Sequence, residues 1–165
     1  MFCQTRSGRV LTPVIVLLCL LSGFAPAADQ PQWGQRFTRN MVSQETGLPA
    51  RFDPETGENI HWTVPLGTEC YSTPVVGNGR VLIGTNNNRP RDAKHDGDRG
   101  VLMCLSEADG SLEWQFVVPK LDSDVYFDWP ECGMTSTAVV EGDRVYMVTN
   151  RDEVVCLDLL GMSNG

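Results

Sequence analysis

Residues 72–87 read STPVVGNGRVLIGTNN, and residues 136–151 read STAVVEGDRVYMVTNR, with eight of the sixteen aligned positions identical. Each copy has an apolar run, a short turn rich in Gly, Asn, Asp or Glu, and a second apolar run. This is the pattern of a β-hairpin, with its turn at residues 77–79 or 141–143. The chain therefore carries the same hairpin twice, at an offset of 64 residues.

A third strand is expected after each hairpin. Residues 101–106 (VLMCLS) match residues 153–158 (EVVCLD) at an offset of 52. The 12 residues by which the two offsets differ are a polar, turn-rich insertion between Asn87 and Gly100, as expected of a surface loop. Cys104 and Cys156 occupy the same repeat position, where a small, buried, apolar side chain is the usual reason for cysteine.

A fourth strand is expected after a glycine turn, and it carries a tryptophan. Gly110 precedes Trp114 in the second copy, and Gly57 precedes Trp62 in an earlier one, which predicts a strand over residues 58–64. The glycine supplies a backbone conformation that other residues resist, and the tryptophan covers a large apolar area on the adjacent unit.

The repeat is therefore a unit of four antiparallel strands and about 50 residues, which predicts an all-β fold, a β-propeller of four-stranded blades. A β-sandwich also has short strands at regular spacing, but it would not repeat the sequence so closely. We expect about two to two and a half blades: the end of one blade at 51–66, a full blade at 70–118 and an incomplete one at 134–160. Residues 28–50 are an extended segment. A closed ring needs at least four blades, so we expect the chain to be the N-terminal fragment of a larger protein.

Residues 1–27 have the layout of a secretory signal peptide. Arg6 and Arg9 precede an apolar run from Val10 to Phe24, and an A-x-A-type cleavage signal follows at Ala25. An N-terminal membrane anchor is the alternative, although about 15 apolar residues are short for a bilayer. We expect a periplasmic or secreted mature protein, with no membrane span after cleavage.

The full chain has a net charge of −8, and removing two arginines with the signal peptide makes it −10. This balance argues against nucleic acid as a partner, because phosphate binding needs clustered Lys and Arg. Four cysteines remain, without the C-x-x-C spacing of a zinc site. Cys70 and Cys132 both precede innermost strands that converge near the axis. A disulfide between them and two free thiols are both open interpretations.

Two segments resemble a known family. Residues 52–57 (FDPETG) with Trp62, and residues 105–110 (LSEADG) with Trp114, resemble the repeat of pyrroloquinoline-quinone-type propellers. Residues 31–34 (PQWG) resemble the start of secreted bacterial members of this group. The family includes quinone-dependent alcohol dehydrogenases and a non-catalytic lipoprotein of the outer-membrane assembly machine, so the resemblance implies the fold and leaves the activity open.

Few residues suggest chemistry. Trp129, in the loop before an innermost strand, is a candidate for stacking on a ligand or cofactor, with loop packing as the alternative. Asp128 and Glu131 beside it are candidate cation ligands, and a solvated acidic loop is the alternative. Residues 95–98 (HDGD) have ligand-type side chains but lack the register of a calcium loop.

Two functions remain. The first is an exported, non-catalytic scaffold or binding surface, whose partners would be the missing blades, further copies of the chain or an envelope protein. The second is the N-terminal part of a pyrroloquinoline-quinone-dependent oxidoreductase. The resemblance implies that pyrroloquinoline quinone and calcium would bind only in a complete propeller, and no cofactor is evident from these residues. Whether the full-length protein is an enzyme stays open, and for this chain alone we favour a non-enzyme.

Overall fold

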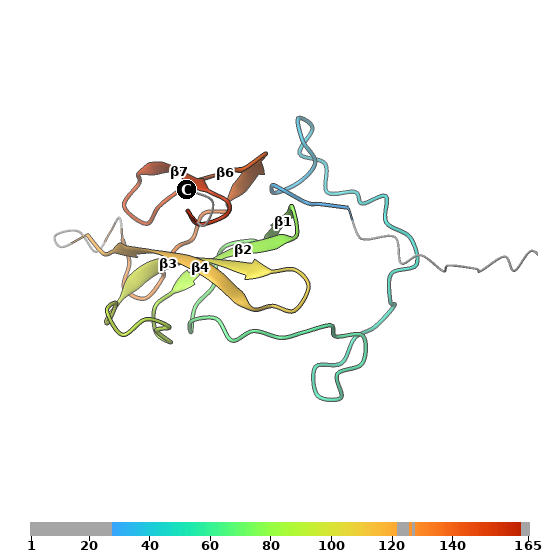
Figure 1. Cartoon of the computed structure of the whole chain (residues 1–165), viewed down its shortest axis with the longest axis horizontal. Helices are drawn as coiled ribbons and strands as arrows, with labels where there is room; N and C mark the ends of the chain where they lie inside the picture. Colours follow the sequence, from blue (N-terminus) through green and yellow to red (C-terminus); the bar gives the residue numbers. More distant parts are fainter. Residues whose placement is uncertain (1–27, 122–125, 127, 163–165) are drawn as a thin grey trace, which may run out of the picture.

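The computed structural model describes residues 28–121, 126 and 128–162, which form two antiparallel sheets (Figure 1). The first contains β1 (Val75–Gly77), β2 (Arg80–Asn86), β3 (Arg99–Ser106) and β4 (Leu112–Pro119), in that spatial order. The second contains β5 (Val139–Glu141), β6 (Arg144–Val148) and β7 (Val154–Asp158). Each strand pairs with its sequence neighbour, so the predicted all-β propeller-type sheets are confirmed. No helix of a length and apolarity suited to crossing a membrane occurs in this part of the chain.

Both predicted hairpins close with two-residue turns whose chemistry fits their sequence. Gly77 pairs with Arg80, and the residues between them, Asn78 and Gly79, have φ of 52° and 75°. Positive φ at both central positions is the type I′ turn that Asn-Gly favours. In the second hairpin only Gly142, with φ of 60°, needs this conformation.

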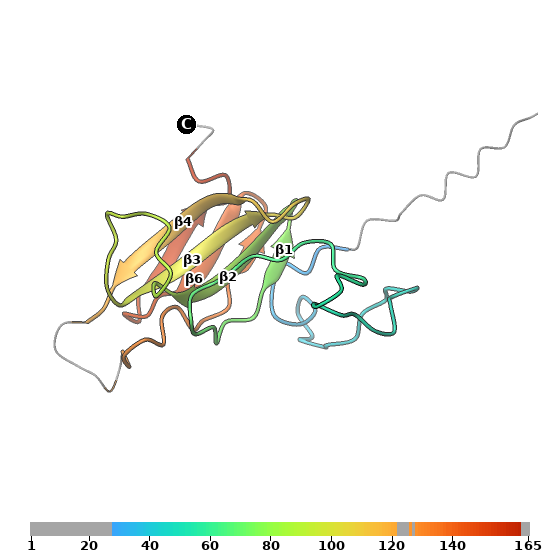
Figure 2. The ribbon, with the colours of Figure 1, turned by 90° about the horizontal axis from the view of Figure 1, so that it is seen from below.

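The two sheets stack face to face, with the main core between them (Figure 2). Successive strand residues point to opposite faces, so alternate side chains enter this core. Leu82, Leu102 and Cys104 from the first sheet are 0% exposed, and Val145 and Met147 come from the second. Sheet-on-sheet stacking of this kind is how neighbouring propeller blades stabilise each other.

The opposite face of β1–β4 carries a second, smaller core. Val101, Met103 and Leu105 are buried there, and residues 62–66 pack over them through Trp62, Val64 and Leu66. All six side chains are apolar. The segment that precedes the first sheet therefore covers it in part, as the last strand of a preceding blade would.

The two tryptophans make equivalent contacts. Trp62 Nε1 donates to the Glu107 carbonyl at 2.8 Å, and Trp114 Nε1 donates to the Leu159 carbonyl at 2.9 Å, each spanning 45 residues. Each indole also lies against a glycine, because a Cβ on Gly110 would meet Trp62 at 2.7 Å and one on Gly161 would meet Trp114 at 2.4 Å. Each tryptophan thus docks on the glycine turn of the following sheet rather than on the turn of its own repeat.

One expected strand has no ladder. Residues 58–64 form no strand, and this region shows only an isolated bridge between Asp53 and Glu58. A strand needs a neighbour for its backbone groups, and the described residues contain no third strand of that preceding blade. Gly57 still closes the predicted turn, with φ of 79° and its N–H donating to the Asp53 carbonyl at 2.9 Å.

Cys104 and Cys156 differ in environment although they share a repeat position. Cys104 is buried between the sheets, and burial raises the pKa of its thiol to about 12, whereas Cys156 is exposed. The expectation of a buried cysteine is therefore confirmed for Cys104 and wrong for Cys156.

These environments predict selective alkylation of the native chain. The thiolate is the nucleophile in alkylation. At pH 8, far below the pKa of the buried Cys104 thiol, Cys104 stays protonated and is not modified by iodoacetamide. The exposed Cys156 reacts. Peptide mass spectrometry after brief labelling measures both sites, with the denatured chain as control. Equal labelling of the two cysteines in the native chain would contradict the assigned core.

Candidate functional site

Strands β1 and β5 lie side by side, as the innermost strands of successive propeller blades do around the propeller axis. Hydrogen bonds join repeat-equivalent positions 64 residues apart. Ser72 Oγ donates to the Ser136 carbonyl at 3.0 Å, and Asn78 Nδ2 donates to the Gly142 carbonyl at 2.8 Å. The sequence repeat is therefore also a repeat in space.

The N-terminal segment occupies the axial edge, by which we mean the free edges of β1 and β5. Val76 N donates to the Gln30 carbonyl at 2.9 Å, and Val140 N donates to the Pro31 carbonyl at 2.7 Å. Val76 and Val140 occupy the same position in the two repeats. Two successive carbonyls of the N-terminal segment therefore accept hydrogen bonds from equivalent N–H groups of the two sheets. Figures 1 and 2 both show this segment beside β1, on the side away from β4. Asp29 adds a bond from its Oδ2 to the Asn78 N–H at 2.9 Å.

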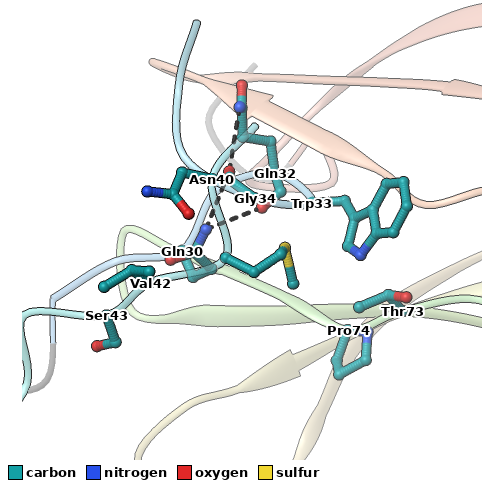
Figure 3. A pocket seen from close by; sticks show the side chains of 10 residues that line it. Gln30, Gln32, Trp33, Gly34, Asn40, Val42, Ser43, Thr73 and Pro74 are labelled. Atoms are coloured by element: carbon teal, nitrogen blue, oxygen red, sulfur yellow. Dashed lines mark hydrogen bonds between the residues drawn. The ribbon is translucent and has the colours of Figure 1, made fainter. Parts of the chain in front are cut away.

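A cavity of about 200 Å³ lies between this segment and the start of β1 (Figure 3). Its polar groups largely bond to one another, because Gln30 Nε2 and Gln32 Nε2 both donate to the Gly34 carbonyl, at 3.0 and 3.2 Å. Gln32 is 9% exposed, whereas Trp33 is 60% exposed. The segment is thus held in place by its own amides.

A buried charged cluster lies in the loop that leads from β4 to β5. The Asp128 side chain is 2% exposed and forms an ion pair with Lys120, whose side chain is 16% exposed. Asp128 Oδ2 also accepts from Leu121 N at 2.9 Å and from Asn150 Nδ2 at 3.0 Å. Buried charges persist when they are paired and hydrogen-bonded, so this cluster fixes the loop. The solvated acidic loop considered as an alternative is wrong for Asp128.

Trp129 lies next to this cluster and is 63% exposed. It lines a cavity of about 280 Å³ together with Asp128, Cys132, Thr149 and other polar residues. Lys120 also donates to the Trp129 carbonyl at 2.5 Å, so the backbone below the indole is held. Packing within the loop remains the alternative for this tryptophan. A flat ring could stack on the indole, and stacking stays a prediction.

The cation-site prediction gains no support from the geometry. The described residues contain no group of three or more His, Cys, Asp or Glu side chains arranged to hold a metal. The Asp128 carboxylate is already engaged with Lys120, and Glu131 is exposed, its backbone N–H donating to Asp98 Oδ2 at 2.6 Å. Asp98, from the HDGD segment, thus braces the same loop. Metal binding by Asp128 and Glu131 remains untested.

All four described cysteines are free thiols in the structure. Cys70 Sγ donates to the Gly84 carbonyl at 3.2 Å, and its partial burial raises the pKa of this thiol. Cys132 lines the loop cavity. A disulfide between the two stays a prediction for an oxidising compartment.

Comparison with known proteins defines the family. A model of the PQQ-like repeat, described as outer membrane protein assembly factor BamB, matches residues 37–161. The chain belongs to this family. A search of curated proteins finds no match. The family assignment agrees with the stacked antiparallel sheets and the two docked tryptophans, and it leaves the activity open, because one fold hosts unrelated functions.

Sequence reasoning missed two parts of this BamB-type chain's candidate site. Gln30 and Pro31 act through backbone carbonyls, which carry no residue-type signal. Lys120 and Asn150 reach Asp128 from the end of β4 and the loop after β6, and no local pattern brings them together. A partial signal existed for Asn150, because the Thr-Asn pair at 149–150 repeats the pair at 85–86.

Proposed function

We propose that the protein is an exported, non-catalytic propeller module that acts as a scaffold or binding surface. The observation that carries this proposal is the axial edge. The backbone N–H groups of Val76 and Val140, which lie on this edge, donate to the carbonyls of Gln30 and Pro31 in the chain's own N-terminal segment. A ligand bound at this edge would have to displace these hydrogen bonds. It would also have to displace the bonds that the side-chain amides of Gln30 and Gln32 donate to the Gly34 carbonyl.

The arrangement of charge supports the same proposal. The buried carboxylate of Asp128 is neutralised by Lys120 and bonded to Asn150, which suits a group that holds a loop rather than one that exchanges protons with a substrate. Beside it, Trp129 offers an exposed indole on a fixed backbone, and tryptophan is enriched among residues that dominate binding energy at interfaces.

A cofactor titration tests the non-catalytic part. Pyrroloquinoline quinone with Ca²⁺ is added to the purified chain while tryptophan fluorescence and dye reduction with simple alcohols are followed. We expect no saturable quenching and no dye reduction. Saturable quenching that Trp129→Phe abolishes, together with dye reduction, would contradict the proposal and support the quinone-dependent oxidoreductase instead.

The exported location rests on the pattern of residues 1–28, which lie mostly outside the described residues. N-terminal sequencing of the chain expressed in a secreting bacterium tests it. We expect a mature protein that begins at Ala28 or Asp29 in the periplasmic or culture fraction. An intact Met1 recovered from the membrane fraction would contradict cleavage.

A further inference from the structure

The loop that leads from β4 to β5 contains a tight turn with an unusual residue in it. Cys132 N donates to the Trp129 carbonyl at 3.3 Å, and Glu131 has φ of 64°. Pro130 precedes Glu131, and its ring fixes φ at about −65°. This combination is a type II turn, whose third position requires a positive φ and usually holds glycine. Glu131 therefore carries a side chain where the backbone conformation disfavours one.

Contacts from outside the turn impose this conformation. Lys120 Nζ donates to the Trp129 carbonyl at 2.5 Å, and Asn86 Nδ2 donates to the Glu131 carbonyl at 2.7 Å. Glu131 N donates to Asp98 Oδ2 at 2.6 Å. A strained residue persists when its surroundings hold it in this way, and such residues cluster at functional sites. We call residues 129–132 the rigid turn.

The rigid turn lies beyond the ends of the strands. Asn86 is the last residue of β2, and Lys120 directly follows β4. Both reach the turn from that end of the first sheet. Neighbouring sheets of a propeller stack through their faces, so a turn at the strand ends lies outside this stacking.

The side chains of the rigid turn are turned to solvent. Trp129 is 63% exposed, and Pro130 and Glu131 are exposed as well. Among the described residues, none donates to the Glu131 carboxylate or forms an ion pair with it. The Cα atoms of Trp129 and Glu131 are two residues apart, which is at most about 7 Å, so one side chain of a partner can reach both.

The charge beneath the rigid turn is negative. Lys120 pairs with Asp128, and its Nζ is also 4.0 Å from the Asp98 carboxylate, so one cation lies between two anions. Glu131 adds a further anion, and the nearby Arg151 is itself in an ion pair. The full chain has a net charge of −8. Both the local and the overall charge therefore favour a cationic partner group.

We propose that the rigid turn binds an arginine side chain presented by a partner protein. A guanidinium group is planar and cationic, so it can stack on the Trp129 indole and pair bidentately with the Glu131 carboxylate. Lysine offers a point charge without the planar fork and should bind less well. This inference rests on the proposed function as a binding surface, and it names the chemistry of the partner.

A titration followed by nuclear magnetic resonance tests the proposal. The purified chain is titrated with acetyl-glycyl-arginyl-glycinamide, and the arginine methylene protons report stacking, because an indole ring shifts their resonances. We expect a saturable shift for the wild type. Glu55→Gln, the matched control, removes an exposed carboxylate elsewhere and should bind equally well. Glu131→Gln and Trp129→Leu should each weaken binding several-fold.

Two further peptides define the chemistry of the ligand. The citrulline peptide has the shape of arginine without the charge and should show no saturable shift, and the lysine peptide should bind several-fold more weakly. No saturable shift with the arginine peptide, or undiminished binding to Glu131→Gln, would overturn the proposal. So would equal binding of the citrulline or the lysine peptide. Dye reduction in the cofactor titration would instead contradict the proposed function, whatever the peptides do.

Glu131→Gly separates recognition from folding. Glycine accepts a positive φ without strain, so the urea midpoint of this variant should stay the same or rise, while binding of the arginine peptide is lost. This result would also show that the variant is folded. A lower midpoint would mean that the Glu131 side chain serves the fold, and the proposal would be wrong.

Discussion

Replacing Trp114 by alanine is expected to lower the free energy of unfolding by about 3–5 kcal/mol. The indole packs on the core between the sheets, lies against Gly161 and donates to the Leu159 carbonyl at 2.9 Å. Alanine removes most of this apolar contact and leaves the buried carbonyl of Leu159 without its donor. Urea denaturation followed by circular dichroism measures the change.

Two controls separate the causes. Trp114→Phe keeps an aromatic ring but loses the donor, and should cost about 1–3 kcal/mol, the usual penalty for one unsatisfied buried group. Trp129→Ala removes an indole that is 63% exposed and should change stability by no more than about 0.5 kcal/mol. If Trp129→Ala destabilised the chain as much as Trp114→Ala, the assignment of Trp114 as the docking residue would be wrong.

Replacing Lys120 by methionine is expected to cost about 3–5 kcal/mol, because it leaves the Asp128 carboxylate buried without its cation. Methionine has nearly the length of the lysine stem, so lost packing contributes little. The loss should be measured by urea denaturation at neutral pH.

The double variant Lys120→Met, Asp128→Asn tests the electrostatic origin of this effect. The asparagine side chain is neutral and can keep an acceptor for Leu121 N. The double variant should therefore be more stable than Lys120→Met alone, with a coupling energy of about 1–3 kcal/mol. Purely additive effects would show that Lys120 acts through packing instead of charge.

Most of the fold could be predicted because it is encoded locally. Apolar alternation, the Asn78-Gly79 turn and the glycine turns all act within one strand pair, and their repetition at offsets of 64 and 52 residues reveals the blade. The strand expected at residues 58–64 is not formed, because a strand needs a neighbouring strand to pair with and not only a suitable sequence of its own. The docking partner of each tryptophan likewise lies in the next sheet, out of reach of local patterns.

The candidate site could be predicted much less well. Trp129 was singled out from its place in a loop before an inner strand, and its role stays a prediction. The burial of Asp128 could not be predicted, because it depends on Lys120 and Asn150 reaching it from other elements. The axial contacts are made by backbone groups of Gln30 and Pro31, so side-chain types carry no information about them. Tertiary context decided both cases.

Amide hydrogen exchange at Val76 and Val140 tests the central claim, that the chain closes its own axial edge, most directly. Both amides donate to the N-terminal segment, at 2.9 and 2.7 Å. We predict that they exchange slowly in the native chain, and that deletion of residues 28–33 makes these two amides exchange fast while Met103, in the central strand β3, stays protected. Fast exchange of Val76 and Val140 in the intact chain, with Met103 protected, would contradict the account.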